Sequence, residues 1–222
     1  MKTTLIRSDM KKVIYFMALL LTCAAFTGCS FCQSDKGKQD SKDYDGVVVD
    51  FNKGVEHIQA QHRQMMYGIA KGKKYAWYES KVMFRDSLKA DNLDDVHVVD
   101  VTDVFQTFDP ALCQTISTNI EKGTIIPEPI PDLWIEDVDM SELPLKITAG
   151  DVIEKLKAWD GIIPPAQGMT LRCPLGPRRC NAQWVIGNIK DVIFIDAVTG
   201  DITDWCPAFP DPRVDGPLGE WP

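Results

Sequence analysis

The sequence predicts an α+β protein made of two successive units, each a helix followed by an antiparallel meander of strands. Three observations predict this class. Apolar residues at helical spacing recur at two places, each stripe is followed by short β-rich runs, and a proline-rich run separates the two sets. We therefore expect an N-terminal unit over residues 46–124, a join over 125–146, a C-terminal unit over 147–206 and a proline-rich tail over 207–222.

The first helix is predicted soon after residue 50, where apolar residues and one histidine follow one another at three- and four-residue intervals. This spacing places side chains on a single helical face. Gly72 marks the end of the helix, because glycine accepts the left-handed backbone that often follows a last turn. The residues of the predicted face are Val55, Ile58, His62, Met65 and Ile69.

Extended structure is expected from Tyr75 to Phe84 and from Val96 to Phe105, because aromatic and β-branched residues dominate both runs. A further helix is expected after Asp109-Pro110, with the aspartate as N-cap and the proline at the first helical position. The apolar stripe of this expected helix consists of Leu112, Cys113, Ile116 and Ile120.

The run IIPEPIP, residues 125–131, cannot form a regular helix or a central strand, because its alternate prolines lack N–H groups. We interpret it as the join between the two units. The following run LWIEDVDM, residues 133–140, is expected to form one short strand.

The second unit is expected to begin with a helix capped by Thr148 and Asp151, which stand three apart as in a capping box. Gly161 and the pair Pro164-Pro165 end this helix. Three strands are expected after it, in the runs MTLRC, AQWVIGN and DVIFIDA, with a return into Ile202. The apolar side of the helix consists of Val152, Ile153, Leu156 and Trp159.

Residues 1–28 have the layout of a secretory signal, in which basic residues precede a short apolar run and a small-residue stretch. Met10 is an alternative start. The run FTGC, ending at Cys29, resembles the lipobox of bacterial lipoproteins, although that family usually has leucine where Phe26 stands. The resemblance implies cleavage before Cys29 and lipidation of its thiol. The polar and charged composition that follows predicts a flexible tether over residues 29–45. The lipobox resemblance implies a protein anchored to a bacterial membrane, the outer membrane being preferred, with its body in the periplasm or at the cell surface.

The chain has 24 basic and 32 acidic residues and a formal net charge of −8. Such a surface repels phosphate backbones, so we expect no nucleic-acid partner. We also expect no cofactor, and no membrane attachment other than the lipid.

Seven cysteines are present, and Cys23 and Cys29 are assigned to the signal and to the lipid. Cys173 and Cys180 flank the run PLGPRR, a loop that can bring them together as a disulfide. A second predicted disulfide joins Cys113 and Cys206. A zinc site is the alternative, but structural zinc sites favour cysteines two to four residues apart.

Three short motifs of the C-terminal half resemble a PepSY domain. They are ITAGDVIEKLK, QWVIGN and DVIFIDAVTGDI, and the last contains the Asp-Ala-x-Thr-Gly pattern of that family at Asp196, Ala197, Thr199 and Gly200. The resemblance covers residues 147–204, and the insertion CPLGPRRC departs from it. It implies a small α+β module without a catalytic site, of a kind for which inhibition or binding of peptidases has been proposed.

The residues Asp196, Thr199 and Gly200 are expected to form a turn. Glycine accepts positive φ, and the aspartate and threonine side chains accept hydrogen bonds from nearby N–H groups. A calcium loop using Asp196, Asp201 and Asp204 is the alternative, but the spacing lacks the alternating carboxylates and the bidentate glutamate of an EF-hand loop.

No catalytic motif is apparent. The three histidines are not paired on one helical face, and the sequence lacks HExxH, a nucleophile elbow and a phosphate-binding glycine loop. His62 is interpreted as a partly buried structural residue. We therefore expect no catalytic residue and no metal site.

Arg172, Arg178 and Arg179 cluster around the predicted Cys173–Cys180 loop, and such a loop can bind a carboxylate or an acidic partner. We expect a lipid-anchored envelope protein that binds a protein or peptide without catalysis, with peptidases as one partner class. The alternatives are an envelope hydrolase whose site lies between the two units, and a lipoprotein that binds a small ligand.

Overall fold

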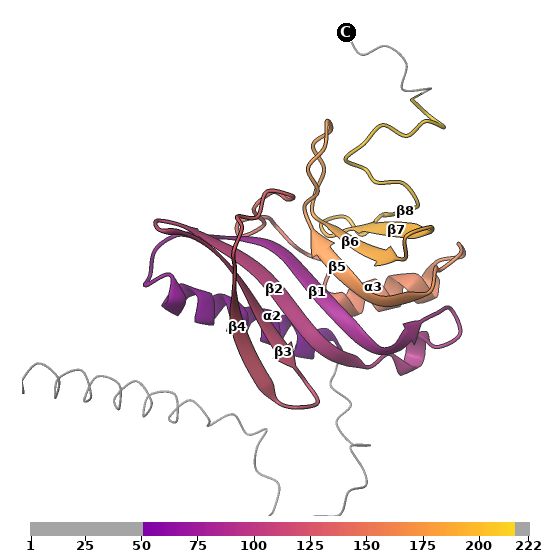
Figure 1. Ribbon diagram of the computed structural model, residues 1–222. Helices are drawn as coiled ribbons and strands as arrows, with labels where there is room; N and C mark the ends of the chain where they lie inside the picture. The colour runs from indigo at the N-terminus through magenta and orange to yellow at the C-terminus, as the bar shows by residue number, and fades with distance from the viewer. Residues whose placement is uncertain (1–50, 216–222) are drawn as a thin grey trace, which may run out of the picture. The chain divides into compact units, whose positions relative to one another are not determined.

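The computed structural model describes residues 51–215, in which eight antiparallel strands form one sheet with two α-helices on one of its faces (Figure 1). The strand order is β4-β3-β2-β1-β5-β6-β7-β8. The predicted α+β class is confirmed. Each helix precedes four strands in the chain, and the two sets of strands meet at the β1–β5 pair.

The first described helix, α2, spans Phe51–Ile69 and buries one stripe against the sheet. Val55 and His62 of the predicted stripe are buried, while its other members pack at the margins of the core. The helix ends as predicted at Gly72, whose φ is 74° and whose N–H donates to the carbonyl oxygen of Tyr67 at 3.0 Å.

Strands β1 (Tyr75–Leu88) and β2 (Val98–Phe108) confirm the two extended runs predicted after the first helix. A short 3₁₀ helix, η1 (Leu93–Asp95), connects them. Their register places Val82 opposite Val101 and Trp77 opposite Phe105, so that these side chains lie under the helices.

The helix predicted after Asp109-Pro110 is wrong: residues 111–119 form strand β3 (Ala111–Asn119), hairpinned to β2 across that dipeptide. A spacing of four residues, as between Leu112 and Ile116, fits a strand as well as a helix, because four is also a multiple of the strand period of two. The β-branched residues of this run and its pairing with β2 select the strand.

The proline-rich run expected to be the join instead forms strand β4 (Thr124–Ile130) at one edge of the sheet. The exclusion of a central strand was correct, because an edge position leaves room for residues without N–H groups. Pro127 and Pro129 pair with Ile116 and Gln114 of β3.

Residues 133–140 do not form the expected strand. The segment after β4 is irregular and contains a single isolated bridge, between Asp137 and Pro174. Backbone hydrogen bonds connect it to its surroundings. The N–H of Met140 donates to the carbonyl oxygen of Trp77 at 2.7 Å, and the N–H of Val138 donates to the carbonyl oxygen of Cys173 at 2.9 Å.

The second helix, α3 (Ala149–Ala158), begins with the predicted capping box. The Thr148 hydroxyl accepts from the Asp151 N–H at 3.1 Å, and the Asp151 carboxylate accepts from the Thr148 N–H at 2.9 Å. Val152, Ile153 and Leu156 are buried as predicted.

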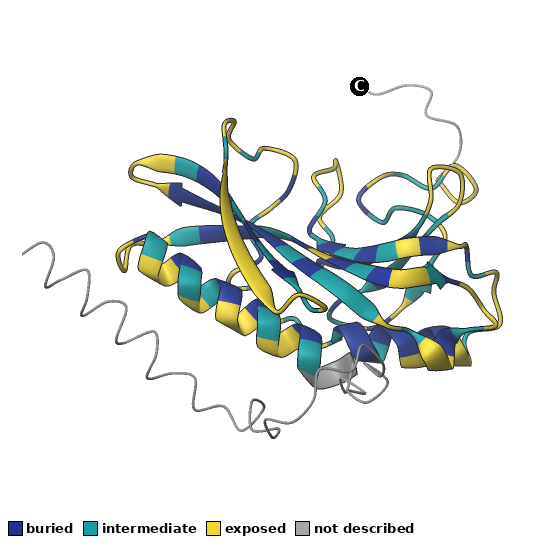
Figure 2. Cartoon of the chain, turned by 60° about the horizontal axis from the view of Figure 1, so that its bottom comes forward, coloured by how far each residue is buried: buried dark blue, intermediate teal, exposed yellow. Residues whose placement is uncertain are grey.

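Four strands follow this helix: β5 (Ala166–Arg172), β6 (Gln183–Gly187), β7 (Val192–Asp196) and the two-residue β8 (Ile202–Thr203). They match the predicted runs. Buried and exposed residues alternate along β5 to β7, which leaves a helix-free face on the other side of the sheet (Figure 2).

The predicted signal segment 1–28, the lipidation site Cys29, the tether to residue 45 and the last residues of the proline-rich tail lie outside the described residues.

Candidate functional site

Three irregular segments meet at one end of the sheet (Figure 1). They are residues 131–141 after β4, residues 173–182 between β5 and β6, and residues 204–215 after β8. Hydrogen bonds and ion pairs connect all three, and we therefore consider them together as the candidate site.

The first connection is an ion pair between Arg172 at the end of β5 and Asp137 of the first segment. Arg172 Nε lies 2.7 Å from Asp137 Oδ1, and the Asp137 side chain is fully buried. Trp134 Nε1 donates to the other carboxylate oxygen at 3.0 Å. A buried carboxylate must be paired and hydrogen-bonded, so this ion pair fixes the first segment on the sheet.

The second connection joins the β5–β6 loop to the segment after β8. The Arg178 N–H donates to the carbonyl oxygen of Ala208 at 3.2 Å, and the Arg178 guanidinium lies 2.6 Å from Asp215. Gly176 approaches Ala208 so closely that an added Cβ would lie 2.3 Å from its carbonyl oxygen. Only glycine allows this backbone approach.

The joined segments expose apolar side chains to solvent. We call this set, together with the arginine at the loop tip, the loop surface. Of its apolar members, Ile135 is 78% exposed and the other four lie between 43% and 51%. The loop surface consists of Leu133, Ile135, Val138, Leu175, Phe209 and Arg179.

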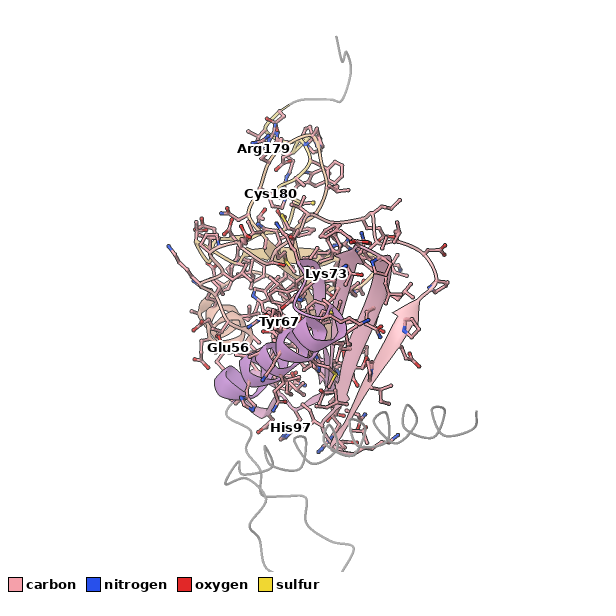
Figure 3. All side chains as sticks on the ribbon, turned by 90° about the vertical axis from the view of Figure 1, so that its left-hand side faces the viewer. Glu56, Tyr67, Lys73, His97, Arg179 and Cys180 are labelled. Atoms are coloured by element: carbon pink, nitrogen blue, oxygen red, sulfur yellow. The ribbon has the colours of Figure 1, made fainter. Side chains whose placement is uncertain are left out.

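The three arginines that the sequence assigned to binding occupy different environments. Arg172 is partly buried and paired with Asp137, and Arg178 is paired with Asp215. Arg179 is exposed at the loop tip, above Cys180, and has no ion pair among residues 51–215 (Figure 3). Of the three, Arg179 therefore has the guanidinium that a carboxylate can reach without breaking an internal pair.

A row of polar side chains crosses the helix-free face behind the loop surface. Glu79, Arg172, Gln183 and Asp196 are successive cross-strand partners on β1, β5, β6 and β7. Burial raises the pKa of Glu79, and Asp137 raises it further, against the effect of Arg172. Within the described part of the chain, the Gln183 Oε1 atom is buried without a hydrogen-bond partner.

Asp196 makes the turn between β7 and β8. Its Oδ1 atom accepts from the N–H groups of Val198 and Thr199 at 2.8 and 2.9 Å, and Gly200 has φ 80°. Burial opposes ionisation of this carboxyl, but those two hydrogen bonds and a third from Asn181 lower its pKa.

The four described cysteines fall into two groups. Cys113 is buried in β3, opposite Gln106 and Ile130. Cys173, Cys180 and Cys206 lie around the β5–β6 loop, and the Cys173 thiol lies 3.9 Å from the Cys180 carbonyl oxygen. Strands β2 and β1 separate β3 from β5 in the sheet.

A second polar cluster, which sequence reasoning missed, lies inside the first half of the fold. His62 Nδ1 lies 2.6 Å from Asp103 Oδ2, and His62 Nε2 lies 2.7 Å from Thr118 Oγ1. Trp77 Nε1 donates to the other Asp103 oxygen at 3.1 Å. The order carboxylate, imidazole, hydroxyl is that of a hydrolase triad, but His62 and Asp103 are fully buried and Thr118 is 7% exposed. A substrate therefore has no access to it.

The sequence signal for this cluster was a polar residue within each of three largely apolar runs. These residues are His62 in the first predicted helix, Asp103 in a predicted strand, and Thr118 in a run that was predicted to be helical. Only the register of β2 and β3 brings these residues together, with Asp103 opposite Ile116 and Val101 opposite Thr118.

A shallow depression of about 260 Å³ lies on the helix-free face, away from the loop surface. Its lining mixes apolar and polar residues, and Lys81 has no ion pair among the described residues. Its lining includes Lys81, Met83, Thr170, Val185, Asn188 and Val192.

Within residues 51–215, no three His, Cys, Asp or Glu side chains are grouped so that they could hold a metal ion. No helix in this part of the chain has the length and apolar content needed to cross a membrane.

Comparison with protein-family models, with curated proteins and with solved structures gave no match.

Proposed function

We propose that this chain is a lipid-anchored envelope protein whose folded body binds a protein partner through the loop surface, without catalysis. The anchor is the lipid on Cys29 predicted from the lipobox resemblance. The observation that carries the binding proposal is the loop surface itself, in which apolar side chains stay exposed on three segments that are fixed to one another.

Exposed apolar side chains gathered in one place are typical of interaction sites. Ile135 and Leu175 belong to different segments, but the bridge between Asp137 and Pro174 brings these segments together. Ion pairs and backbone hydrogen bonds hold the segments before any partner arrives, so binding would cost little ordering entropy.

The mode of binding is side-chain docking rather than strand addition. Pro127 and Pro129 remove two N–H donors from β4, so an added strand would lack partners along this edge. The other edge strand, β8, has only two residues. The partner is therefore a folded protein with an apolar patch and a carboxylate that can reach Arg179. The resemblance to PepSY domains adds envelope peptidases as the first class to test.

The test uses the full chain, solubilised in detergent and immobilised, with an envelope extract from the native cell as the source of partners. Bound proteins are crosslinked and quantified by mass spectrometry. The double variant Ile135→Glu/Leu175→Glu changes the loop surface. The matched control is Ile162→Glu/Ile189→Glu, which places the same charges at two exposed isoleucines elsewhere, 89% and 104% exposed.

We expect one protein to bind near stoichiometrically, to be lost with the loop-surface variant and to be retained with the control. Crosslinks should map to residues 131–141 and 173–182. A partner retained equally by both variants would contradict the assignment of the surface, and no enriched partner at all would contradict the function.

The depression at Lys81 favours a second candidate, the binding of a small anionic molecule. Its volume is slightly below that of ordinary ligand pockets, and its lining of apolar and polar residues with one cation suits a short carboxylate. Calorimetry with a panel of small carboxylates and the variant Lys81→Met tests this. Binding that the variant abolishes would favour it over the protein partner.

A further inference from the structure

Cys180 has two cysteines near it, Cys173 at the start of the same loop and Cys206 in the segment after β8. Cys173 follows β5, Cys180 closes the loop before β6, and Cys206 follows β8. The Cys173 thiol lies 3.9 Å from the carbonyl oxygen of Cys180. Burial, followed by the neighbouring thiols of Cys173 and Cys206, raises the pKa of Cys180 to about 11. Cys180 thus has one thiol neighbour in its own segment, Cys173, and one in the segment after β8, Cys206.

The backbone contacts explain why Cys206 reaches this loop. Gly176 and Arg178 both meet Ala208, through the close approach of the glycine and through the hydrogen bond from the Arg178 N–H. Cys180 lies two residues after Arg178 in the sequence, and Cys206 lies two residues before Ala208. These contacts therefore hold the segment that contains Cys206 against the loop that contains Cys180.

We propose that the three cysteines form a thiol–disulfide exchange site in which Cys180 is shared. In one state Cys180 is bonded to Cys173, and the disulfide closes the β5–β6 loop on itself. In the other state Cys180 is bonded to Cys206, and the disulfide joins this loop to the segment after β8. Cys113, on β3 and separated from β5 by the two strands β2 and β1, stays a thiol.

The first oxidation needs an external disulfide, such as oxidised glutathione. A protein thiolate attacks it, one S–S bond breaks, and a mixed disulfide forms with release of one small thiolate. A second protein thiolate then attacks the protein sulfur of the mixed disulfide and releases the second. Two protein thiols are oxidised, the external disulfide is reduced to two thiols, and the two protons pass to the released thiolates.

Exchange between the two states then needs no further oxidant. The Cys206 thiolate attacks the Cys180 sulfur of the Cys173–Cys180 disulfide, the new S–S bond forms as the old one breaks, and Cys173 leaves as a thiolate. The reverse step restores the first state. The direction depends only on which of the two arrangements the fold favours.

The state bonded to Cys206 would fix Phe209 relative to Leu175, because Cys206 lies three residues before Phe209 and accepts its N–H at 3.0 Å. This consequence for the loop surface depends on the function proposed above. The exchange site itself does not, and its test involves no partner.

The test is disulfide mapping of the full chain after equilibration in glutathione buffers of defined redox ratio. Acid quenching and alkylation trap the thiols. Trypsin cleaves after Arg178, Arg179, Lys190 and Arg213, so each of the three cysteines lies on its own peptide. Linked peptides then identify each pair by mass.

The wild-type chain should yield both the Cys173–Cys180 and the Cys180–Cys206 linked peptides. Cys173→Ser should yield only the Cys180–Cys206 peptide, Cys206→Ser only the Cys173–Cys180 peptide, and the control Cys113→Ser the wild-type pattern. A wild-type map with only one pair at every redox ratio, or a linked Cys113–Cys206 peptide, would overturn the proposal. The wild-type map decides this even where a variant fails to fold.

Discussion

The two halves of the sheet have the same order of elements but different interiors. Under α2 the sheet presents polar side chains, and Gln59 and His62 of the helix are hydrogen-bonded to Ser80, Asp103 and Thr118. Under α3 the buried residues are apolar, as with Leu156 of the helix and Ile186 and Ile195 of the strands.

The difference indicates that one layout can be stabilised in two ways. An apolar interface tolerates changes of packing and has no directional requirement. A buried hydrogen-bonded network is satisfied in one arrangement only, and a partner left unpaired costs several kcal/mol. We therefore expect the first half to be the more sensitive to loss of a single side chain.

The largest predicted effect follows from removing His62. His62→Ala leaves the Asp103 carboxyl fully buried without its nearest partner, and we expect unfolding free energy to fall by about 3–5 kcal/mol. Urea unfolding followed by tryptophan fluorescence measures this.

A control in the other half sharpens the comparison. Leu156→Ala makes only a cavity and is expected to cost about 2–4 kcal/mol. The double variant His62→Ala/Asp103→Ala should recover part of the loss of His62→Ala, because it removes the unpaired carboxyl. Strictly additive losses would refute the interpretation of the cluster as a coupled network.

The next effect concerns Arg172, which connects the two halves to the first loop segment. Arg172→Ala leaves Asp137 buried without its cation, and we expect a loss of about 2 kcal/mol because Arg172 itself is partly exposed. Arg179→Ala serves as the matched control and should change stability by less than about 0.5 kcal/mol. Thermal unfolding of both variants tests this, and equal losses would contradict the different roles assigned to the two arginines.

A smaller effect is expected at the start of α3. Thr148→Ala removes the side-chain acceptor of the capping box and should cost about 1 kcal/mol. Thr148→Ser keeps the acceptor and should restore most of the stability in chemical unfolding. If the serine variant were as unstable as the alanine variant, the methyl group rather than the cap would be responsible.

The smallest effect is a pH dependence with opposite signs at two carboxyls. Folding lowers the pKa of Asp196. Its contribution to the stability of the folded state is therefore present above the ordinary carboxyl pKa of about 4 and is lost as pH falls through the lower folded value. Folding raises the pKa of Glu79, chiefly through burial. Its contribution to the stability of the folded state is therefore present below about pH 4 and is lost as pH rises through the higher folded value.

Asp196→Asn should therefore be less stable than the wild type near pH 6 by roughly 0.5–1 kcal/mol, and the difference should shrink toward pH 3. Glu79→Gln should show the reverse trend: its unfolding free energy should increase relative to that of the wild type as pH rises. Urea unfolding across this pH range measures both. A difference independent of pH at either residue would contradict its pKa shift.

The sequence predicted the second half well, because its local signals agree with the fold. The capping box at Thr148 and Asp151, the apolar side of α3 and the turn at Gly200 are each set by neighbouring residues, and each β-rich run there became a strand. It predicted the first half less well. The run after Asp109-Pro110 has a four-residue spacing that fits two periods, and its pairing with β2 decided the outcome.

The candidate site was only partly predictable. The sequence indicated the loop between Cys173 and Cys180 and its arginines, because they are close in the chain. It gave no sign that Asp137 neutralises Arg172 or that Cys206 lies beside Cys180, since these contacts join segments that are far apart in the chain.

The α+β class, the start of α3 and most strands were predictable from the sequence alone, because these depend on periodicity, caps and turns within a few residues. Three features became visible only in the folded molecule: both sets of strands form one sheet, the proline-rich run is its edge, and His62 of α2 meets Asp103 and Thr118 of the sheet. These features depend on strand register and on contacts between distant segments, and local residue patterns do not encode either of them uniquely.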